Sequence, residues 1–502
     1  MRRFRSRAQT IAALFIALAA ALSLSAHVGS PDVYYEGDAG PYHLFVAVRV
    51  PQVIPGVAEI EIRCATKDVR TIQIVPMRLS GPGSNYPPIP DLAEQSKEDS
   101  QFFTGSLWLM EWGPLKVRVS VDGAKGKGEL SVPVAAAAQK TLEMERPLGG
   151  LLALLMVFLA VGIVFIAGAA VREGNLGPGE TPAPGSVRRA RVVMAISAVV
   201  VVGILYLGRA WWNADAGNYR HRVNLFKPPA AETKLESGNR LVIWPKPQYA
   251  EWSNYIKMEE VIPDHGHLMH LFVIGVPELD RMWHFHPERI AGGAFAQELP
   301  SMPAGRYEIF ADIVDKDGFP WTLVGSVVLT QINGKALAGD DSAWSGAAFP
   351  SQLDDVSPLA DGGRMIWQRG KDSLKANVPM NFKFAVEDKD GQPAKALEPY
   401  MGMAGHAEFV STDMSVFAHV HPAGSVSMAA LELARLGPAS ASGELPAGLS
   451  TSTPMSMGMS SAPMSSEVSF PYGFPRAGDY RIFVQIKRAG RVETGVFDAH
   501  VQ

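Results

Sequence analysis

Residues 265–287 read HGHLMHLFVIGVPELDRMWHFHP, and residues 400–422 read YMGMAGHAEFVSTDMSVFAHVHP. In each stretch a histidine opens an apolar run, and a His-x-His-Pro motif follows 14 residues later in the first copy and 13 in the second. A Gly-x-Tyr sequence then begins an alternating run, with its tyrosine at Tyr307 and at Tyr480. This internal repeat predicts two related domains in the second half of the chain.

Each Gly-x-Tyr resembles the tyrosine corner of immunoglobulin-like sandwiches, in which the phenol bonds back to nearby backbone. We therefore predict β-sandwiches over residues 226–333 and 361–502, joined by a linker, residues 334–360, rich in Gly, Ala, Ser and Asp. The interval from the motif's proline to the tyrosine is 20 residues in the first copy and 58 in the second. The second copy thus carries an insertion, in which residues 428–436 are predicted to form a short helix.

The N-terminal part of the chain, residues 27–140, alternates apolar and polar residues in short runs separated by Gly and Pro. Period-2 runs at this spacing predict an antiparallel sandwich. The predicted strands are His43–Val50, Ala58–Arg63, Thr71–Val75, Leu115–Val121 and Glu129–Val134. The expected fold class is mainly β, with three immunoglobulin-like β-sandwich domains and a two-helix transmembrane hairpin.

The hairpin is predicted from two apolar segments, residues 148–171 and 192–210. The first has no charge, and the second has none before Arg209, which can snorkel. The first is long enough for about 30 Å of hydrocarbon. Arginines dominate the connecting loop, residues 172–191, so the positive-inside rule places it in the cytoplasm. Residues 1–26 have four arginines before a short apolar run and are predicted to be a signal peptide. The arginines of the loop and those of the signal peptide both place the N-terminal and C-terminal β portions outside the cytoplasm. In a bacterium this means an inner-membrane protein with N- and C-terminal domains in the periplasm.

Composition excludes several classes of function. The single cysteine excludes a disulfide framework, and the net charge of −4 gives no electrostatic basis for nucleic-acid binding. Phosphate loops and serine-hydrolase elbows are not apparent, and we do not expect an enzyme. The expected partner from these features is the membrane.

Six of the twelve histidines fall on matching positions of the repeat. In His-x-His on a strand both side chains face one side, and a histidine 13 or 14 residues earlier fits the adjacent strand of a hairpin. Three imidazoles could then converge on one ion such as Cu(II), Zn or Ni. The alternative is that these histidines are polar strand residues bonded to backbone. The predicted ligands are His270, His284 and His286 in the first copy, His406, His419 and His421 in the second, and the nearby His265 and His267.

Other residues could complete copper sites. Thioethers favour Cu(I), and methionines lie before His406 and in the insertion, where packing explains them poorly. If the signal peptide is cleaved after Ala26, the amino group and imidazole of His27 could chelate Cu(II), with His43 completing the set. Asp312 is either a ligand or imidazole acceptor, or merely a polar strand position; its counterpart is Gln485. The predicted methionine ligands are Met401, Met403, Met455, Met457 and Met459.

The pattern of His, a gap, HxHP and then a Gly-x-Tyr strand resembles YtkA-like periplasmic domains, over about 250 residues that contain both repeats. The sequence HVGSPDV, which begins at His27, more loosely resembles the start of CopC-like copper proteins. The resemblance implies immunoglobulin-like domains that bind copper or another heavy metal outside the cytoplasm. It implies ligand roles for the six histidines of the repeat and, through the CopC-like pattern, for His27.

Two functions follow as expectations. The first is a membrane-anchored periplasmic copper-binding protein for copper trafficking, homeostasis or resistance, with Cu(II) on the histidine sets and Cu(I) on the methionine loop. Its expected partners, besides the membrane, are other copper-handling or respiratory proteins. The second is a periplasmic interaction or assembly scaffold of immunoglobulin-like domains, with the histidines incidental.

Overall fold

Short antiparallel strands dominate the computed structural model, which describes residues 27–28, 32–81, 83–177, 179–223, 225–246, 256–351, 355–370, 372–395, 397–436 and 464–502. The predicted signal peptide and the predicted ligands Met455, Met457 and Met459 lie outside these residues. The chain forms two compact units. One combines the parts before Ala138 and after Phe226, and the other is Ala138–Phe226.

The N-terminal sandwich forms where the alternating runs were predicted. In β4 (Gly56–Cys64) every second residue is buried. One sheet has the order β2-β3-β4-β8-β7 and the other β10-β9-β5-β6. The other strands of the first sheet are β2 (Val33–Ala39), β3 (Tyr42–Arg49), β8 (Phe102–Leu109) and β7 (Glu94–Gln95). Those of the second are β10 (Gly126–Ala136), β9 (Gly113–Gly123), β5 (Val69–Arg78) and β6 (Asp91–Leu92).

The first repeat forms a second sandwich. Its larger sheet runs β13-β18-β14-β15-β20, with β19 beside β18, and its smaller sheet runs β11-β12-β17-β16. The larger sheet contains β13 (Val261–Ile262), β18 (Gly305–Asp315), β14 (His270–Val276), β15 (Arg281–Phe285), β20 (Ser342–Ser345) and β19 (Pro320–Leu329). The smaller sheet contains β11 (Ala231–Glu236), β12 (Arg240–Pro245), β17 (Phe295–Glu298) and β16 (Glu288–Arg289). Short 3-10 turns cover Met258–Glu260 and Ala291–Gly293.

The second repeat forms the third sandwich. One sheet runs β1-β26-β25-β28-β24 with β29 beside β28, and the other runs β21-β22-β23-β27. The first contains β1 (His27–Val28), β26 (Val416–Val420), β25 (His406–Ser411), β28 (Gly478–Arg488), β24 (Leu397–Glu398) and β29 (Arg491–Val501). The second contains β21 (Val356–Pro358), β22 (Arg364–Trp367), β23 (Met380–Glu387) and β27 (Glu467–Tyr472). Helix α4 (Met428–Leu436) lies in the insertion, as predicted.

Two segments depart from the predicted boundaries. Residues 334–360 are not only a linker, because β20 pairs with β15 of the first repeat and β21 pairs with β22 of the second. The chain start also leaves the N-terminal sandwich, since β1 runs parallel to β26, with His27 opposite Val416. The composition of a segment does not show which sheet its backbone N–H and C=O groups will pair with.

The two tyrosine corners have the predicted form. The Tyr307 hydroxyl donates to the carbonyl of Pro303 at 2.7 Å, and the Tyr480 hydroxyl donates to that of Arg476 at 2.9 Å. Both bonds reach four residues back, where the backbone turns into the long strand. Equivalent bonds at equivalent positions support the description of these domains as two copies of one immunoglobulin-like unit.

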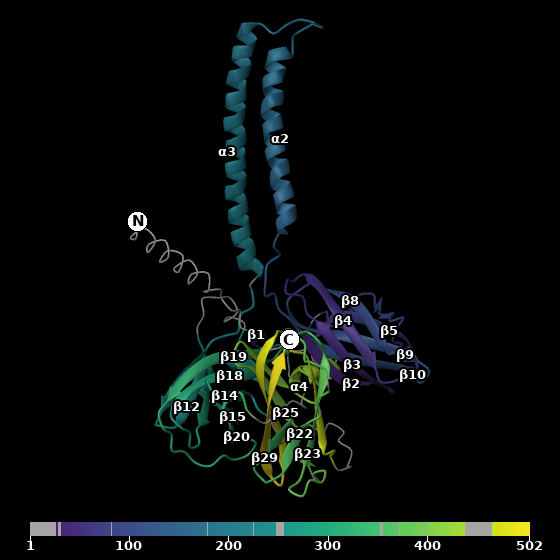
Figure 1. The fold of residues 1–502 in the computed structure, drawn as a ribbon, viewed down its shortest axis with the longest axis vertical. Coiled ribbons are helices and arrows are strands. Elements are labelled where there is room, and N and C mark those ends of the chain that lie inside the picture. The colour runs from purple at the N-terminus through teal and green to yellow at the C-terminus, as the bar shows by residue number, and fades with distance from the viewer. Residues whose placement is uncertain are drawn as a thin grey trace, which may run out of the picture. The chain divides into compact units, whose positions relative to one another are not determined.

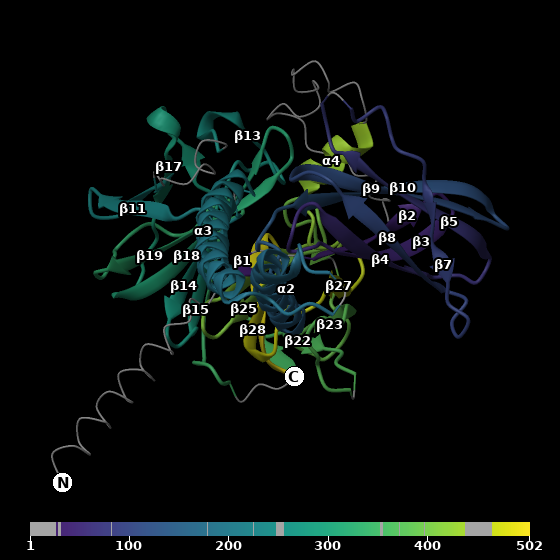
Figure 2. The same ribbon diagram turned by 90° about the horizontal axis from the view of Figure 1, so that it is seen from above.

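The two repeats pack sheet against sheet, and the sheet with β14 and β15 lies beside that with β25 and β28 in both views (Figures 1 and 2). The rings of Phe310 and Phe417 stack across this interface with centroids 4.3 Å apart. For this reason β14 and β25 are buried nearly throughout, on their own core side and on the side of the other repeat. The shared core contains Phe272, Ile274, Leu279, Met282 and Phe310 of the first repeat with Val410, Phe417, Phe483 and Val496 of the second.

The other unit contains two long helices, α2 (Arg146–Glu173) and α3 (Pro184–Val223), which run side by side (Figure 1). Both have segments long and apolar enough to cross a membrane, which is consistent with membrane association. They extend past the predicted spans at both ends. Gly168 lets them approach closely, because a Cβ there would lie 2.4 Å from Cγ of Met194.

Candidate metal centre

Eight histidines gather at one end of the interface between the repeats. Ring centroids of neighbouring members lie 3.9 to 6.2 Å apart. The sequence analysis named all eight, but it assigned them to two separate domains. The cluster consists of His265, His267, His270, His284, His286, His406, His419 and His421.

The strand geometry confirms how each repeat contributes. Strand β14 pairs with β15, so that Phe272 lies opposite His284 and His270 lies near the end of β15. The rings of His284 and His286 are 4.6 Å apart, and so are those of His419 and His421, because alternate residues face one side of a sheet. His-x-His on one strand and a histidine on the next do converge.

The first candidate ligand group matches the prediction. His270, His284 and His286 each offer one nitrogen, and these three atoms lie within 4.8 Å of one another. Nδ1 of His270 is 3.2 Å from Nε2 of His284. Two nitrogens bound to one tetrahedral ion at about 2.0–2.1 Å would be about 3.3 Å apart, so this spacing fits an ion between them.

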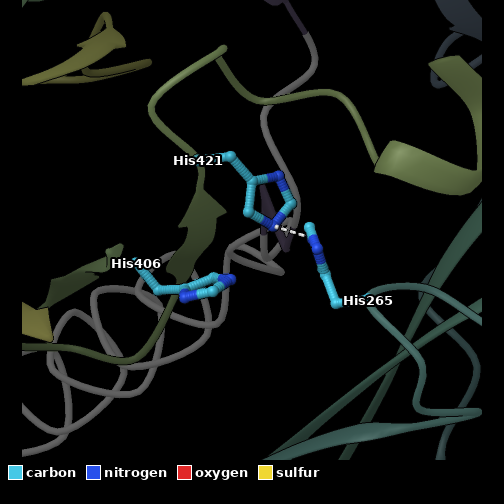
Figure 3. Close-up of side chains that lie close together, drawn as sticks. All are labelled: His265, His406 and His421. Atoms are coloured by element: carbon cyan, nitrogen blue, oxygen red, sulfur yellow. Dashed lines mark hydrogen bonds between the residues drawn. The ribbon is translucent and has the colours of Figure 1, made fainter. Parts of the chain in front are cut away.

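The second group differs from the predicted one. His406 and His421 are joined by His265 of the first repeat, with ligand atoms again within 4.8 Å (Figure 3). Nε2 of His265 is 3.1 Å from Nε2 of His421. His265 has a positive φ of 53° and Gly266 one of 85°, in a turn closed by hydrogen bonds between Asp264 and His267. This turn carries His265 to the other repeat, a placement that sequence spacing within one repeat cannot reveal.

The outward nitrogens of the cluster meet groups that only accept hydrogen bonds. His270 Nε2–H donates to the carbonyl of Asp264 at 3.1 Å, and His421 Nδ1–H donates to that of Val426 at 3.0 Å. His286 Nδ1–H donates to the Asp341 carboxylate at 2.9 Å. A neutral imidazole carries one N–H, so each of these rings must turn its lone pair toward the centre.

Two acceptors cross between the repeats reciprocally. His284 Nδ1 lies 2.9 Å from Oε1 of Gln485 in the second repeat. His419 Nδ1 lies 3.4 Å from Oδ2 of Asp312 in the first. Asp312 and Gln485 occupy equivalent positions, opposite His270 and His406. Asp312 therefore lies beside an imidazole of the second repeat, while its Oδ1 accepts from the hydroxyl of Thr322 at 2.5 Å.

Several inward nitrogens therefore lack donors. Nδ1 of His270 turns a lone pair toward Nε2 of His284, 3.2 Å away. With Oε1 of Gln485 accepting from His284 Nδ1, this Nε2 also carries a lone pair, and the two repel unless a cation lies between them. Nε2 of His286, Nε2 of His419 and both nitrogens of His406 are buried without a hydrogen-bond partner. Buried polar atoms without partners cost free energy, and a bound metal ion would satisfy them.

Burial keeps the imidazoles neutral. It is the main cause that lowers their pKa, and neighbouring imidazoles lower it further, to about 4 at His421 and about 3 at His265. The pKa is well below 6.5 at His270, His284, His286, His406 and His419. Neutral imidazole is the form that binds metal, so the cluster is ready to coordinate without losing protons.

Carboxyl groups surround the cluster. Burial raises the pKa of Asp312 to about 7 and that of Glu408 well above its usual value. Both oxygens of Glu408 are buried without a hydrogen-bond partner. Asp264 accepts the backbone N–H of Ala429 at the start of α4, which fixes the turn before His265. A cation in the centre would favour the charged form of these carboxyl groups.

The remaining predicted ligands have other surroundings. His267 stacks on His286 at 3.9 Å and lies 3.4 Å from Asp340. Met401 and Met403 lie in the turn that precedes β25, where the N–H of Tyr400 donates to the carbonyl of Met403. Of His27 the structure describes the backbone pairing with β26. His43 bonds to Glu36 and Asp38, and Cys64 is buried.

Sequence reasoning missed several carboxylates. Glu408 could have been found, because it is two residues from His406 and therefore on the same face of β25. Asp264 directly precedes His265. Asp340 and Asp341 carry no such signal, because the segment that contains them looks like a linker.

Comparisons with known proteins name no function. Residues 359–502 match a family described as "Domain of unknown function (DUF8832)". Among curated proteins nothing matches. A tetra-tandem repeat of a large adhesion protein has a TM-score of 0.16 at 8% identity, covering 92% of this chain and 74% of that one. An ICAM-5 D1–D4 ectodomain fragment gives 0.14 at 6%, with 91% and 77% covered. A putative membrane-anchored protein from Corynebacterium diphtheriae gives 0.15 at 9%, with 93% and 96% covered. These TM-scores are too low to support an argument about function.

Proposed function

We propose that this chain is a membrane-anchored copper-binding protein. The observation that supports it is a set of buried, neutral imidazoles that turn nitrogens toward one another. Four of these nitrogens, Nε2 of His286, Nε2 of His419 and both of His406, have no hydrogen-bond partner in the part of the chain that the structure describes. A polar network serving structure alone would satisfy its buried nitrogens. A bound metal ion would accept the lone pairs of these nitrogens.

Copper is the metal favoured by the donor set. Imidazole nitrogens suit Cu, Zn and Ni, and on an identical site the Irving–Williams order puts Cu(II) above Zn(II) and Ni(II). The groups that accept hydrogen bonds from the outward nitrogens also support a metal site, because carboxylates and carbonyls orient metal-bound histidines. The methionine run at residues 455–459 remains proposed as a Cu(I) contact.

The biological role proposed is copper trafficking, homeostasis or resistance, at the bacterial inner membrane with the β-domains in the periplasm. The centre is closed, since seven of its histidine side chains are almost fully buried. A closed centre suits holding and handing over an ion better than turnover of a substrate, for which an open coordination position is usual. We therefore do not propose an enzyme.

The test is metal retention by the full chain in detergent. The protein is loaded separately with Cu(II), with Cu(I) under reductant and with Zn(II), then desalted, and metal per chain is measured. We expect tightly held copper in the wild type and less of it in His284→Gln/His421→Gln. The control is His500→Gln, which alters an exposed histidine bonded to Asp479, far along β29.

Two results would count against copper binding at the histidine cluster. Wild-type protein that retains no metal after any loading would leave the scaffold function as the better account. Equal copper in wild type and the double variant, both with cooperative melting, would place the metal elsewhere in the chain.

A further inference from the structure

We infer that the centre is dinuclear: one ion lies on His270, His284 and His286, and a second lies on His265, His406 and His421. This inference rests on the proposed metal-binding function and adds the number of ions, the division of ligands and the sharing of one ion between the repeats.

Two close pairs of imidazole nitrogens, one in each ligand group, carry the inference. One pair is Nδ1 of His270 and Nε2 of His284, 3.2 Å apart. The other is Nε2 of His265 and Nε2 of His421, 3.1 Å apart. The outward nitrogen of His421 is bonded to the carbonyl of Val426, so its inward nitrogen carries no proton. A single ion between one pair leaves the other pair without a cation.

Each group also brings its own third nitrogen. His286 adds an unpartnered buried Nε2 to the first pair, and His406 adds two unpartnered buried nitrogens to the second. Within each group the ligand atoms are within 4.8 Å, the size of one coordination sphere. Eight imidazoles exceed what one Cu or Zn ion binds, since such ions take four or five ligands.

His419 lies between the two groups. Its ring centroid is 5.5 Å from that of His270 and 5.3 Å from that of His406, and its Nε2 is buried without a partner. It can therefore supply a fourth nitrogen to either ion. Glu408, directly opposite His419 in the strand pair, adds a carboxyl group with two unpartnered oxygens. A carboxyl group so placed would offset part of the charge that two buried ions introduce.

The two ions differ in which repeat supplies their ligands. All three ligands of the first ion come from the first repeat: from β14, from β15 and from the residue directly after β15. The second ion takes His265 from the first repeat and two ligands from the second, one in β25 and one directly after β26. The second site is thus incomplete unless the two repeats are packed together.

The test counts copper and measures its magnetic state in the full chain in detergent. We expect two Cu(II) per wild-type chain, with an electron paramagnetic resonance signal smaller than the copper content because the two ions couple. His270→Gln/His286→Gln and His406→Gln/His421→Gln should each retain one Cu(II) with a full mononuclear signal. His500→Gln should retain two.

The outcomes separate the two proposals. No copper in the wild type overturns the proposed function and this inference with it. One copper in the wild type, lost in both double variants, keeps the proposed function and overturns the dinuclear centre. Two coppers that are both lost in either variant, with melting curves like the wild type, also overturn the assignment to independent groups. Glutamine is polar and similar in size to histidine. If a glutamine variant does not fold, the same two histidines are changed to asparagine and the copper per chain is counted again.

Discussion

Four imidazoles of the centre have one nitrogen with a structural role and one nitrogen left for coordination: those of His270, His284, His286 and His421. The structural nitrogen donates outward to a carbonyl, an amide oxygen or a carboxylate, and this fixes both the tautomer and the ring plane. At the residue scale the acceptors are therefore as important as the histidines.

Gln485 tests this role. Gln485→Leu removes the oxygen that accepts from His284 Nδ1–H at 2.9 Å, so the ring loses its fixed tautomer. Loss of such an acceptor costs about 10–100-fold in metal affinity, and we expect a loss in this range for one of the bound coppers. Competition titration against a copper chelator measures it. Gln368→Leu, at an exposed glutamine bonded to Glu467, is the control, and equal affinities in the two variants would contradict the prediction.

His267 differs from its neighbours in exposure: 29% of its side chain is accessible, against 4% for His286, on which it stacks. It is therefore the histidine that an incoming ion meets first. We expect His267→Ala to slow copper uptake several-fold while copper per chain at equilibrium stays unchanged. Stopped-flow mixing with Cu(II) gives the rate. An unchanged rate, or a lower final copper content, would rule out this role.

At the scale of elements, the turn between β25 and β26 holds the two ligand strands together. Burial opposes ionisation of Asp413 in this turn, but hydrogen bonds from Ser411, Ser415 and Arg476 outweigh it and lower its pKa. A depressed carboxyl pKa stabilises the fold above the unfolded value of about 3.9, and this contribution is lost as the pH falls through the folded value.

The consequence is a pH-dependent effect of Asp413→Asn. We expect the variant to melt below the wild type at pH 7. The gap should narrow as the pH falls below about 4, because the unfolded wild-type chain then takes up a proton at this carboxyl group while the folded chain does not. Thermal melting followed by circular dichroism between pH 3 and 7 measures the gap. Asp390→Asn, in an exposed turn, is the control. A gap that widens toward acid pH would reverse the sign and refute the argument.

The two tyrosine corners also stabilise individual elements, each at the start of a long strand. Tyr307→Phe and Tyr480→Phe each remove one hydrogen bond to a carbonyl and keep the buried ring. We expect each to lower the free energy of unfolding by about 1 kcal/mol, the usual net value of such a bond. Urea unfolding followed by tryptophan fluorescence checks this. Tyr206→Phe, in α3, is the control and should leave the curve unchanged.

How far the sequence predicts this molecule depends on whether a feature is local. Period-2 runs, apolar segments and Gly-x-Tyr are local, and the strands, long helices and tyrosine corners lie where they indicate. The His-x-His pairs are local too. His265 and Gln485 are not, because their roles depend on the packing of one repeat against the other, and no spacing within a repeat encodes that.

At the scale of the whole molecule, the hairpin interrupts a unit whose two parts pack together. The N–H of Tyr34 donates to Ser425, and the N–H of Glu36 donates to the carbonyl of Ala423, so β2 is joined to the third sandwich. Residues before and after α2 and α3 must then lie on the same side of any membrane that these helices cross.

Epitope tags test this arrangement in bacterial spheroplasts. A tag after Lys97, in an exposed turn, and a tag after Gln502 should both bind antibody without permeabilisation. A tag after Gly179, between the helices, should bind only after permeabilisation. Access to only one of the first two tags would mean an odd number of crossings and would contradict the fold.

The packing of the two repeats also bears on how this chain arose. Equivalent residues meet across the interface: Ile274 and Val410, Met282 and Phe417, Phe310 and Phe483 all belong to the shared core. Such self-complementarity is the mark of a twofold homodimer, in which each contact occurs twice. Duplication and fusion of a gene for a dimeric one-sandwich ancestor would produce it. After fusion each half can change independently. Phe272 of the first repeat occupies the position that Glu408 occupies in the second, a difference that two identical chains could not have.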